Sequence, residues 1–536
     1  MSDEADVVIV GGGHNALVAA TYLARAGKDV VVLERLPHVG GAAISARTFE
    51  GIDARLSRYS YLVSLMPQQL IDELGLRLEL RSRDTASYTP YDGGGLLVET
   101  VTGEPTRASF RTLTGSDDEL DAWDRFYDEV AELAGVIAPT LLAPLPHIGN
   151  LRDLSEMSIW TDVVDEPLGA AIERRFSHDL VRGVVATDAL IGTFASMHDP
   201  SLIQNRCFLY HLIGNGTGEW RVPVGGMGAV TAELERVARE AGATIRTDAP
   251  VTTVSADDDG VVVSGEGFSV SARWALSGVA PYVLAGLMGE VLPPKPSGSQ
   301  FKINLLVSRL PRLRAGIDPA VAFAGTFHLG ESMSELEAAH ARAAGGSLPD
   351  RAAGELYCHT LTDRSILGPE LAATDAQTLT YFGLHTPYEV LPDADAADRA
   401  YAQFITALDE HLDEPIEPLI LGVEHKTPAQ IEEALGMPGG HIFHGDLQWP
   451  WLEEDERPRH PGQHWGVATK HPRVLLCGSG ARRGGAVSGI AGHNAAHAVL
   501  DADLGEGVAP AAANVAPASR PRSQGGISSI GRAADS

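Results

Sequence analysis

The residues with the clearest chemical signature are small residues that stand between a Val/Ile run and a long Ala/Leu pattern. Gly11, Gly13 and Ala16 form the spacing G-x-G-x-x-A directly after the apolar run at residues 6–10. The first glycine permits a tight turn, the second lets the backbone approach a pyrophosphate, and the third small residue lets a helix pack closely on the strand. Glu34 ends a second apolar run, where a carboxylate can bind ribose hydroxyls. The stretch predicts a dinucleotide site on a strand–helix–strand unit.

The neighbours of these glycines refine the expected site. His14 and Asn15 open the predicted helix; Asn15 is suited to capping it, and His14 is either a cofactor contact or a tolerated loop residue. Glu34 alone fits NAD or FAD. Gly40 and Gly41 follow it closely and indicate a second approach of bare backbone to the diphosphate. This arrangement resembles the N-terminal signature of the glutathione-reductase-type FAD proteins, which implies FAD as the cofactor.

A second glycine-rich segment, near the C-terminus, resembles the part of those proteins that closes over the flavin end. From Arg473 the pattern predicts a strand, a glycine-rich turn and a helix of small residues. Gly478 and Gly480 would also suit a second nucleotide fingerprint, but no further strand ending in an acid follows them. A helix starting near Gly485 would direct its positive end at the flavin edge that gains negative charge on reduction.

Histidines and carboxylates between these segments are the candidates for a catalytic base. The weak candidates are His211, His444 and Asp446, and for each a structural hydrogen bond is favoured over catalysis. His441 and His444 are three residues apart, but the Ile-Phe between them indicates a strand or turn, so no metal site is expected. Four aromatic residues either line a substrate tunnel or fill the core: Tyr210, Trp220, Trp449 and Trp451.

Composition sets limits on partners and location. The chain has 536 residues, 44% of them hydrophobic, and a net charge of −30. With no basic surplus to neutralise phosphates, nucleic acid is not expected as a partner. No apolar run approaches the ~18 residues that span a bilayer, and the acidic start lacks the apolar region of a secretory signal. The three cysteines form no CxxC pair. We therefore expect a cytoplasmic protein, with peripheral membrane contact left open.

The order of these patterns predicts an α/β fold: a Rossmann-like FAD-binding domain of the glutathione-reductase type (GR2) with an inserted mixed α+β substrate domain. A chain of this length exceeds a single core. The expected division is an FAD-binding domain at 1–110, 216–296 and 441–504, a helical substrate or lid region at 111–215, a mixed substrate domain at 297–440, and a disordered tail at 505–536.

Several motifs together resemble the phytoene desaturase-like flavoproteins, and within them the branch of pyridine nucleotide-disulfide oxidoreductase domain-containing protein 2. The matching runs are the N-terminal fingerprint, "SRYSYLVSL", "VPVGGMGAVTAELERVAREAG", "PGGHIFHGDL" and "GSGARRGGAVSGIAGHNAA". The resemblance implies chemistry on an apolar substrate, and not disulfide reduction. It implies these further cofactor contacts: Arg35, Gly40, Gly41, Ala42, Val251, Gly478, Gly485, Ala486 and Val487.

One departure from that family is visible. Carotenoid desaturases usually carry a His-Pro pair in the late motif, whereas this chain has Arg482 and Arg483. Two cations there would either stabilise the anionic reduced flavin or bind phosphate or solvent.

The leading functional expectation is an FAD-dependent oxidoreductase that desaturates or oxidises an apolar, isoprenoid-, carotenoid- or lipid-like molecule by hydride transfer to the flavin N5. The alternatives are a flavin amine oxidase, a reduced-FAD polyene isomerase, and a flavoprotein that acts mainly as a binding partner. Oxygen, a quinone and a redox protein are all possible electron acceptors, and the sequence does not reveal the oligomeric state.

Overall fold

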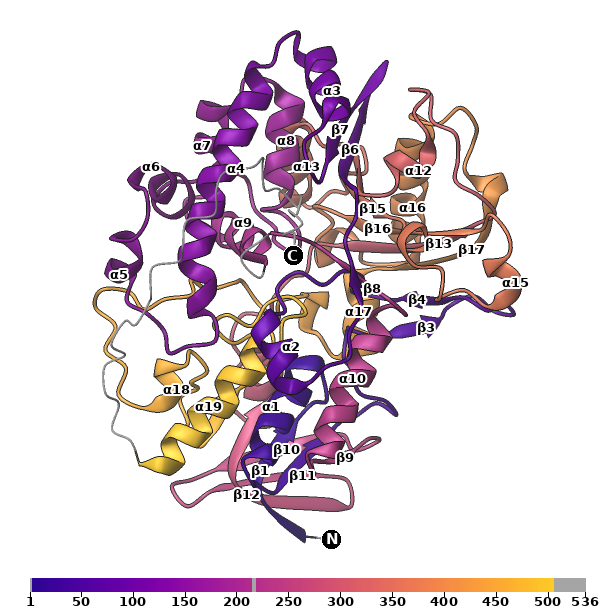
Figure 1. Ribbon diagram of the computed structural model, residues 1–536. Coiled ribbons are helices and arrows are strands. Elements are labelled where there is room, and N and C mark those ends of the chain that lie inside the picture. Colours follow the sequence, from indigo (N-terminus) through magenta and orange to yellow (C-terminus); the bar gives the residue numbers. More distant parts are fainter. Residues whose placement is uncertain (1, 215–217, 506–536) are drawn as a thin grey trace.

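Two seven-stranded sheets, one in each half of the molecule, organise the computed structural model, which describes residues 2–214 and 218–505 (Figure 1). The first sheet lies in the lower half of Figure 1 with the N-terminus, and the second lies above it. Residues 506–536, which hold nearly all of the tail expected to be disordered, lie outside the described residues. The α/β class predicted from the sequence is confirmed.

The first sheet has the strand order β10-β11-β12-β1-β2-β9, with β18 paired to β12. β12, β1, β2 and β9 are parallel to one another, and β10, β11 and β12 form an antiparallel meander. Its central strands are buried, as the continuous Val/Ile runs predict. The strands are β1 (Ser2–Val10), β2 (Val30–Leu33), β9 (Thr244–Arg246), β10 (Val251–Ala256), β11 (Val261–Gly265), β12 (Phe268–Ser277) and β18 (Val474–Leu476).

Three helices accompany this sheet: α1 (His14–Arg25), α10 (Met227–Glu240) and α19 (Ile490–Leu504). Both α10 and α19 pack against α1, which places the N-terminus of α1 in the middle of the molecule (Figure 1). The prediction that the last helix starts near Gly485 is wrong. Ala486 and Gly489 have φ of +57° and +75°, which an α-helix cannot contain, so α19 begins after Gly489.

The second sheet has the order β17-β13-β16-β15-β14-β6-β7. Two of its strands come from residues 85–99, which the expected division assigned to the first part of the FAD-binding domain; here they pair beside β14. The strands are β6 (Thr85–Tyr91), β7 (Gly94–Glu99), β13 (Phe301–Val307), β14 (Thr326–Leu329), β15 (Gly354–Tyr357), β16 (Gln377–Gly383) and β17 (Ile420–Lys426).

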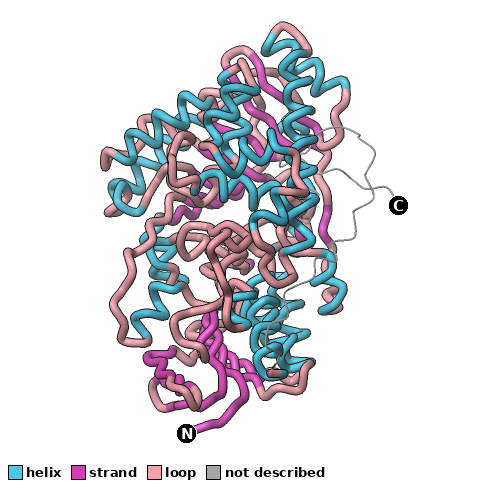
Figure 2. The backbone as a smooth tube through the Cα atoms, turned by 90° about the vertical axis from the view of Figure 1, so that its left-hand side faces the viewer, coloured by secondary structure: helices cyan, strands magenta, loops and turns pink. Residues whose placement is uncertain are grey.

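A helical region between residues 104 and 213 covers the side of the molecule next to the second sheet, as predicted for 111–215 (Figure 2). Its helices are α3 (Glu104–Thr114), α4 (Asp118–Ile137), α5 (Ile148–Arg152), α6 (Met157–Trp160), α7 (Leu168–Arg175), α8 (Asp179–Thr187) and α9 (Ile203–Ile213). Its aromatic and aliphatic side chains form one buried cluster. The apolar residues Leu141, Leu145, Ile148 and Leu151 are buried.

The remaining elements connect these layers. The short strands are β3 (Ser45–Arg47), β4 (Arg55–Ser57), β5 (Leu80–Arg81) and β8 (Val222–Pro223). The further helices are α2 (Gln68–Leu74), α11 (Pro281–Leu287), α12 (Pro319–Ala322), α13 (Met333–Ala344), α14 (His359–Thr362), α15 (Pro369–Ala372), α16 (Ala394–Asp409), α17 (Pro428–Leu435) and α18 (Pro461–His464). Within the described ranges, none of the helices is both long and apolar enough to cross a membrane.

Candidate flavin-binding and active site

The glycine fingerprint forms a tight turn that is locked to Glu34. Gly11 has φ of +90°, and its N–H donates to the carbonyl of Leu33 at 2.8 Å. The Glu34 carboxylate is 7% exposed and accepts N–H bonds from Gly12 at 2.7 Å and from Leu36 at 2.8 Å. These charge-assisted bonds hold the carboxylate at the end of β2, in the position that the sequence predicts for ribose binding.

The helix that follows presents an open N-terminus. The N-cap of α1 is Gly13, and no side chain caps the first turn. A Cβ at Gly13 would meet no atom within 4 Å, and one at Gly41 would come within 3.5 Å of the Gly13 Cα. The N–H of Gly40 donates to the carbonyl of Gly12 at 2.8 Å. Glycine backbone, free N–H groups and the positive end of the helix dipole therefore lie around one concave site, which we call the cradle. This site fits a diphosphate.

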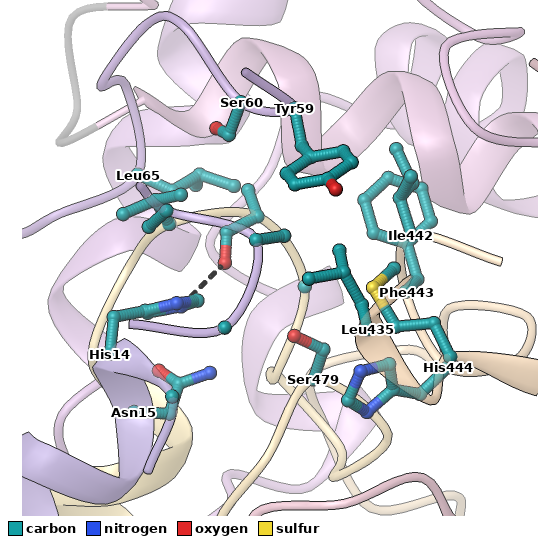
Figure 3. Close-up of a pocket in the computed structure, with 18 of the residues that line it drawn as sticks. His14, Asn15, Tyr59, Ser60, Leu65, Leu435, Ile442, Phe443, His444 and Ser479 are labelled. Atoms are coloured by element: carbon teal, nitrogen blue, oxygen red, sulfur yellow. Dashed lines mark hydrogen bonds between the residues drawn. The ribbon is translucent and has the colours of Figure 1, made fainter. Parts of the chain in front are cut away.

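This cradle opens into a large cavity that continues toward the second sheet. Figure 3 shows His14 and Asn15 on one side of it, Tyr59 and Ser60 across from them, and His444 on the opposite wall. Of the predicted cofactor residues, those that line the cavity are Gly11, Gly13, His14, Asn15, Ala16, Glu34, Gly41, Ala42, Gly478, Gly485, Ala486 and Val487. The structure thus brings together residues more than 400 positions apart in the chain.

The N-terminal and C-terminal parts of this group are joined directly. The Nε2 of His14 lies 3.1 Å from the carbonyl oxygen of Ala486, a contact drawn as a dashed line in Figure 3. The amide of Asn15 donates to the carbonyl of Gly484 at 3.5 Å. Burial lowers the pKa of His14 to about 4, so its ring is neutral near pH 7 and donates one hydrogen bond to Ala486.

Three predicted cofactor residues lie outside the cavity lining. Arg35 is exposed and donates to the carbonyl of Ala434 at 2.8 Å, at the end of α17. Gly40 packs behind the cradle against Thr231. Val251 begins β10, two residues after Ala249, whose N–H donates to the carbonyl of Glu34 at 2.9 Å.

The three candidate bases differ in whether they line the cavity. His211 and His444 line the cavity, and Asp446 does not; its side chain is 59% exposed and lies 3.9 Å from His441. The His211 ring stacks on Trp220 with centroids 5.0 Å apart, and its Nδ1 lies 3.1 Å from the carbonyl of Cys207. Burial lowers the pKa of His211, and it lowers that of His444 to about 4. Both rings are therefore neutral at physiological pH.

Arg482 and Arg483 have a structural role that neither sequence interpretation describes. Arg483 is 1% exposed and donates to the carbonyls of Thr140, Ala143 and Trp465. Arg482 pairs with Glu456 at 3.1 Å. Neither arginine lines the cavity. Both anchor the turn before α19.

Of the four aromatic candidates, Tyr210 and Trp220 line the cavity, whereas Trp449 and Trp451 stack on each other with centroids 4.8 Å apart.

A polar cluster on the cavity wall next to the second sheet was missed by the sequence analysis. Lys302 is 2% exposed, and its Nζ has no hydrogen-bond partner within the described chain. It lies 3.9 Å from the centroid of the Tyr61 ring, which in turn is 4.4 Å from the Tyr357 ring. The Tyr357 hydroxyl donates to Glu355. A signal did exist: Lys302 interrupts the otherwise apolar strand run "FKINLLV" with a charge.

Fold and site together define a class of protein: a two-sheet flavoprotein whose dinucleotide cradle opens into a chamber between the sheets. The chain belongs to the flavin containing amine oxidoreductase family, because the sequence model of that family matches residues 17–419. It is an oxidoreductase of that family, and its cofactor is FAD, as the sequence analysis predicted. The phytoene desaturase-like subtype is a finer assignment than this match gives.

Similar proteins cover more than nine-tenths of the chain. It is 48% identical over 521 residues to uncharacterized protein Rv0897c of Mycobacterium tuberculosis, covering 92% of this chain and 97% of that protein. It is 30% identical over 566 residues to pyridine nucleotide-disulfide oxidoreductase domain-containing protein 2 of Rattus norvegicus, covering 93% and 94%. The branch resemblance noted in the sequence is confirmed.

Solved structures share the fold at low sequence identity. A putrescine oxidase A394C mutant gives a TM-score of 0.57 at 20% identity, covering 94% of this chain and all of that chain. Cyclohexylamine oxidase from Brevibacterium oxydans IH-35A gives a TM-score of 0.56 at 15% identity, with 94% of this chain and 100% of that chain covered. These likenesses support the two-sheet architecture.

Proposed function

We propose that this protein uses FAD to oxidise a C–H bond next to the nitrogen of an amine. The observation that carries the proposal is the continuity of the cavity, which runs from the dinucleotide cradle to a wall that holds Lys302, Glu355 and the Tyr61–Tyr357 pair. Family membership and the names of the structural neighbours point in the same direction. FAD, when bound, supplies the hydride acceptor.

The chain's own residues have two tasks in this reaction. Tyr61 and Tyr357 line the cavity as a pair of aromatic rings, and a substrate ammonium group can bind against such rings by cation–π attraction. Lys302 accepts the proton that the ammonium must lose before oxidation. Burial lowers the pKa of Lys302 well below 10.5, which raises the fraction of neutral, proton-accepting amine near pH 7.

A second candidate function keeps the substrate class expected from the sequence. Part of the cavity wall is apolar, formed by Leu65, Ile191, Phe382, Ile442 and Phe443, and such a wall suits the desaturation of an isoprenoid- or lipid-like molecule. A hydrocarbon, however, would leave the buried ionisable groups without partners, at a cost of several kcal/mol. We therefore place the amine first and assign the apolar wall to the rest of its carbon skeleton.

Product analysis separates these candidates. The FAD-loaded protein is incubated in air with arylalkyl amines or with a polyene hydrocarbon in detergent. We expect carbonyl products and released ammonia from the amines, and no new double bonds in the hydrocarbon. Desaturation of the hydrocarbon without amine turnover would overturn the amine proposal. Supplying a quinone in place of oxygen then tests two of the three possible electron acceptors.

Lys302→Met tests the assignment of the base. We expect the variant to bind FAD normally and to lose about 10²–10⁴-fold in kcat, the usual contribution of a positioned proton acceptor. Raising the pH should rescue part of the loss, because the substrate amine then deprotonates in solution. The matched control is Lys426→Met, a lysine of β17 that does not line the cavity. A kcat unchanged in Lys302→Met would contradict the assignment.

A further inference from the structure

The cavity wall also carries a buried arginine that makes no direct hydrogen bond or ion pair among the described residues. Arg83 is 8% exposed and lines both the large cavity and a smaller one that adjoins it. Within residues 2–214 and 218–505, its guanidinium makes no hydrogen bond and no ion pair within 4 Å; its aromatic contact is the Tyr357 ring, 5.8 Å away. Burial lowers the pKa of Arg83, and the nearby Glu355 and Glu219 partly offset this without pairing with it directly. Glu355 instead accepts the Tyr357 hydroxyl.

Other arginines of the chain show how unusual this is. Arg483, which is more deeply buried than Arg83, donates to three backbone carbonyls. Arg175 pairs with Glu129 and Asp162, and Arg58 pairs with Glu424. A guanidinium stays protonated even when buried, so Arg83 cannot avoid the desolvation cost by losing its charge. An unpaired buried cation that faces a cavity is best explained by a ligand that supplies the missing anion.

We propose that Arg83 binds a carboxylate of the substrate, so that the substrate is an amine that also carries an acid group. The planar guanidinium fork matches a carboxylate with two parallel hydrogen bonds. One positive charge suits a carboxylate better than a phosphate ester, which carries nearly two negative charges at pH 7. The amine half of this statement rests on the proposed function; the carboxylate half rests on Arg83 alone.

The contacts around the tyrosine pair indicate how this substrate is oriented in the cavity. Lys302 lies against Tyr61, Tyr61 against Tyr357, and Tyr357 against Arg83. The proposed proton acceptor therefore contacts Tyr61, and the proposed carboxylate-binding residue contacts Tyr357. A bifunctional substrate lies along the pair, with its amine toward Lys302 and its acid toward Arg83.

Calorimetric titration of the FAD-loaded protein tests the proposal without any turnover. The probes are phenylacetate and its neutral isostere phenylacetamide. We expect the wild type to bind phenylacetate about 10–100-fold more tightly than the amide. Arg83→Gln should lose this preference while binding the amide as before. Arg83→Lys, which keeps the charge but not the fork, should weaken phenylacetate binding about tenfold. The control is Arg239→Gln, an exposed arginine on α10.

The outcomes separate this proposal from the proposed function. A wild type that binds neither probe, or both equally, overturns the carboxylate site, as does an Arg83→Gln variant with the wild-type preference. If Arg83→Gln does not fold, Arg83→Lys decides: phenylacetate binding equal to wild type overturns the proposal. If the protein prefers phenylacetate but does not oxidise amines, the carboxylate site stands and amine oxidation is rejected. If it oxidises amines but shows no preference for phenylacetate, amine oxidation stands and the carboxylate site is rejected.

Discussion

Glu34 links the fold of the fingerprint loop to cofactor binding. Its two oxygens hold the N–H groups of Gly12 and Leu36, and its side chain lines the cavity. Glu34→Gln keeps the shape but removes the charge, and charge-assisted hydrogen bonds contribute about 1.5–3 kcal/mol each. We therefore expect FAD affinity to fall about 10–100-fold. Titrating the apoprotein with FAD measures the affinity. The control is Glu50→Gln, at an exposed carboxyl group. Equal FAD affinity in the two variants would contradict the role of Glu34 in cofactor binding.

His14 gives the protein a specific sensitivity to acid. Burial lowers its pKa from 6.5 to about 4, so between these values the unfolded chain binds a proton that the folded chain does not. The free energy of unfolding therefore falls as the pH drops from about 6.5 to about 4. In His14→Gln this fall should be smaller than in wild type, and in His38→Gln, at an exposed position, it should be unchanged.

Urea denaturation of the apoproteins at several pH values measures the difference between variant and wild type. The comparison is needed because His385, His444 and His493 also have lowered pKa values and contribute to the slope. If the free energy of unfolding changes with pH in the same way in His14→Gln and in wild type, the His14 ring is charged in the folded state.

At the residue scale, the sequence predicted the cofactor end of the site better than the substrate end. Gly11, Gly13 and Glu34 are close in the chain, so their spacing alone predicts a geometry. Arg83 and Lys302 line the same cavity only because two elements from distant parts of the chain face it, and no local pattern encodes that. Arg35 follows Glu34 in the chain, yet its side chain donates to the carbonyl of Ala434 and does not line the cavity.

At the scale of elements, the crossing of α1 and α19 holds the helix N-terminus in place. A Cβ at Gly492 would lie 1.9 Å from the carbonyl oxygen of Asn15. Gly492→Ala should force the helices apart and lower the free energy of unfolding by about 1–3 kcal/mol. Gly135→Ala is the matched control: it lies within α4, where a Cβ meets nothing within 4 Å, and should raise stability by about 0.5–1 kcal/mol.

Denaturant midpoints of both glycine variants, with and without FAD, check this prediction. Gly492→Ala should also weaken FAD binding, since Asn15 belongs to the first turn of α1. Equal destabilisation by both substitutions would mean that the loss comes from general helix effects and not from the crossing.

Elements with regular periodicity were predicted well, and elements that depend on backbone exceptions were not. The predicted strand–helix–strand unit at the N-terminus corresponds to β1, α1 and β2. The start of α19 was misplaced because Ala486, a good helix former, adopts a left-handed conformation there. Side-chain preference gives no warning when tertiary contacts, here with His14, hold the backbone otherwise.

At the scale of the whole molecule, the site is a chamber between two sheets. One wall comes from the fingerprint and the segment before α19, and the other from Tyr61, Arg83, Lys302 and β15. The sequence predicted an inserted substrate domain but not that residues 85–99 pair into the second sheet, because strand pairing across more than 200 residues leaves no periodic trace. Substrate class is therefore a property of the assembled wall, which composition could not reveal.

The most direct test of amine oxidation is the absorbance spectrum of the purified FAD-loaded protein, kept anaerobic and titrated in parallel with an amino acid-like amine, a polyene hydrocarbon and NADPH. The amine should bleach the flavin band in proportion to the amount added, because electrons pass from the substrate to FAD without an acceptor. NADPH and the hydrocarbon should leave the band unchanged. Bleaching by NADPH, or by the hydrocarbon and not by the amine, would contradict the account.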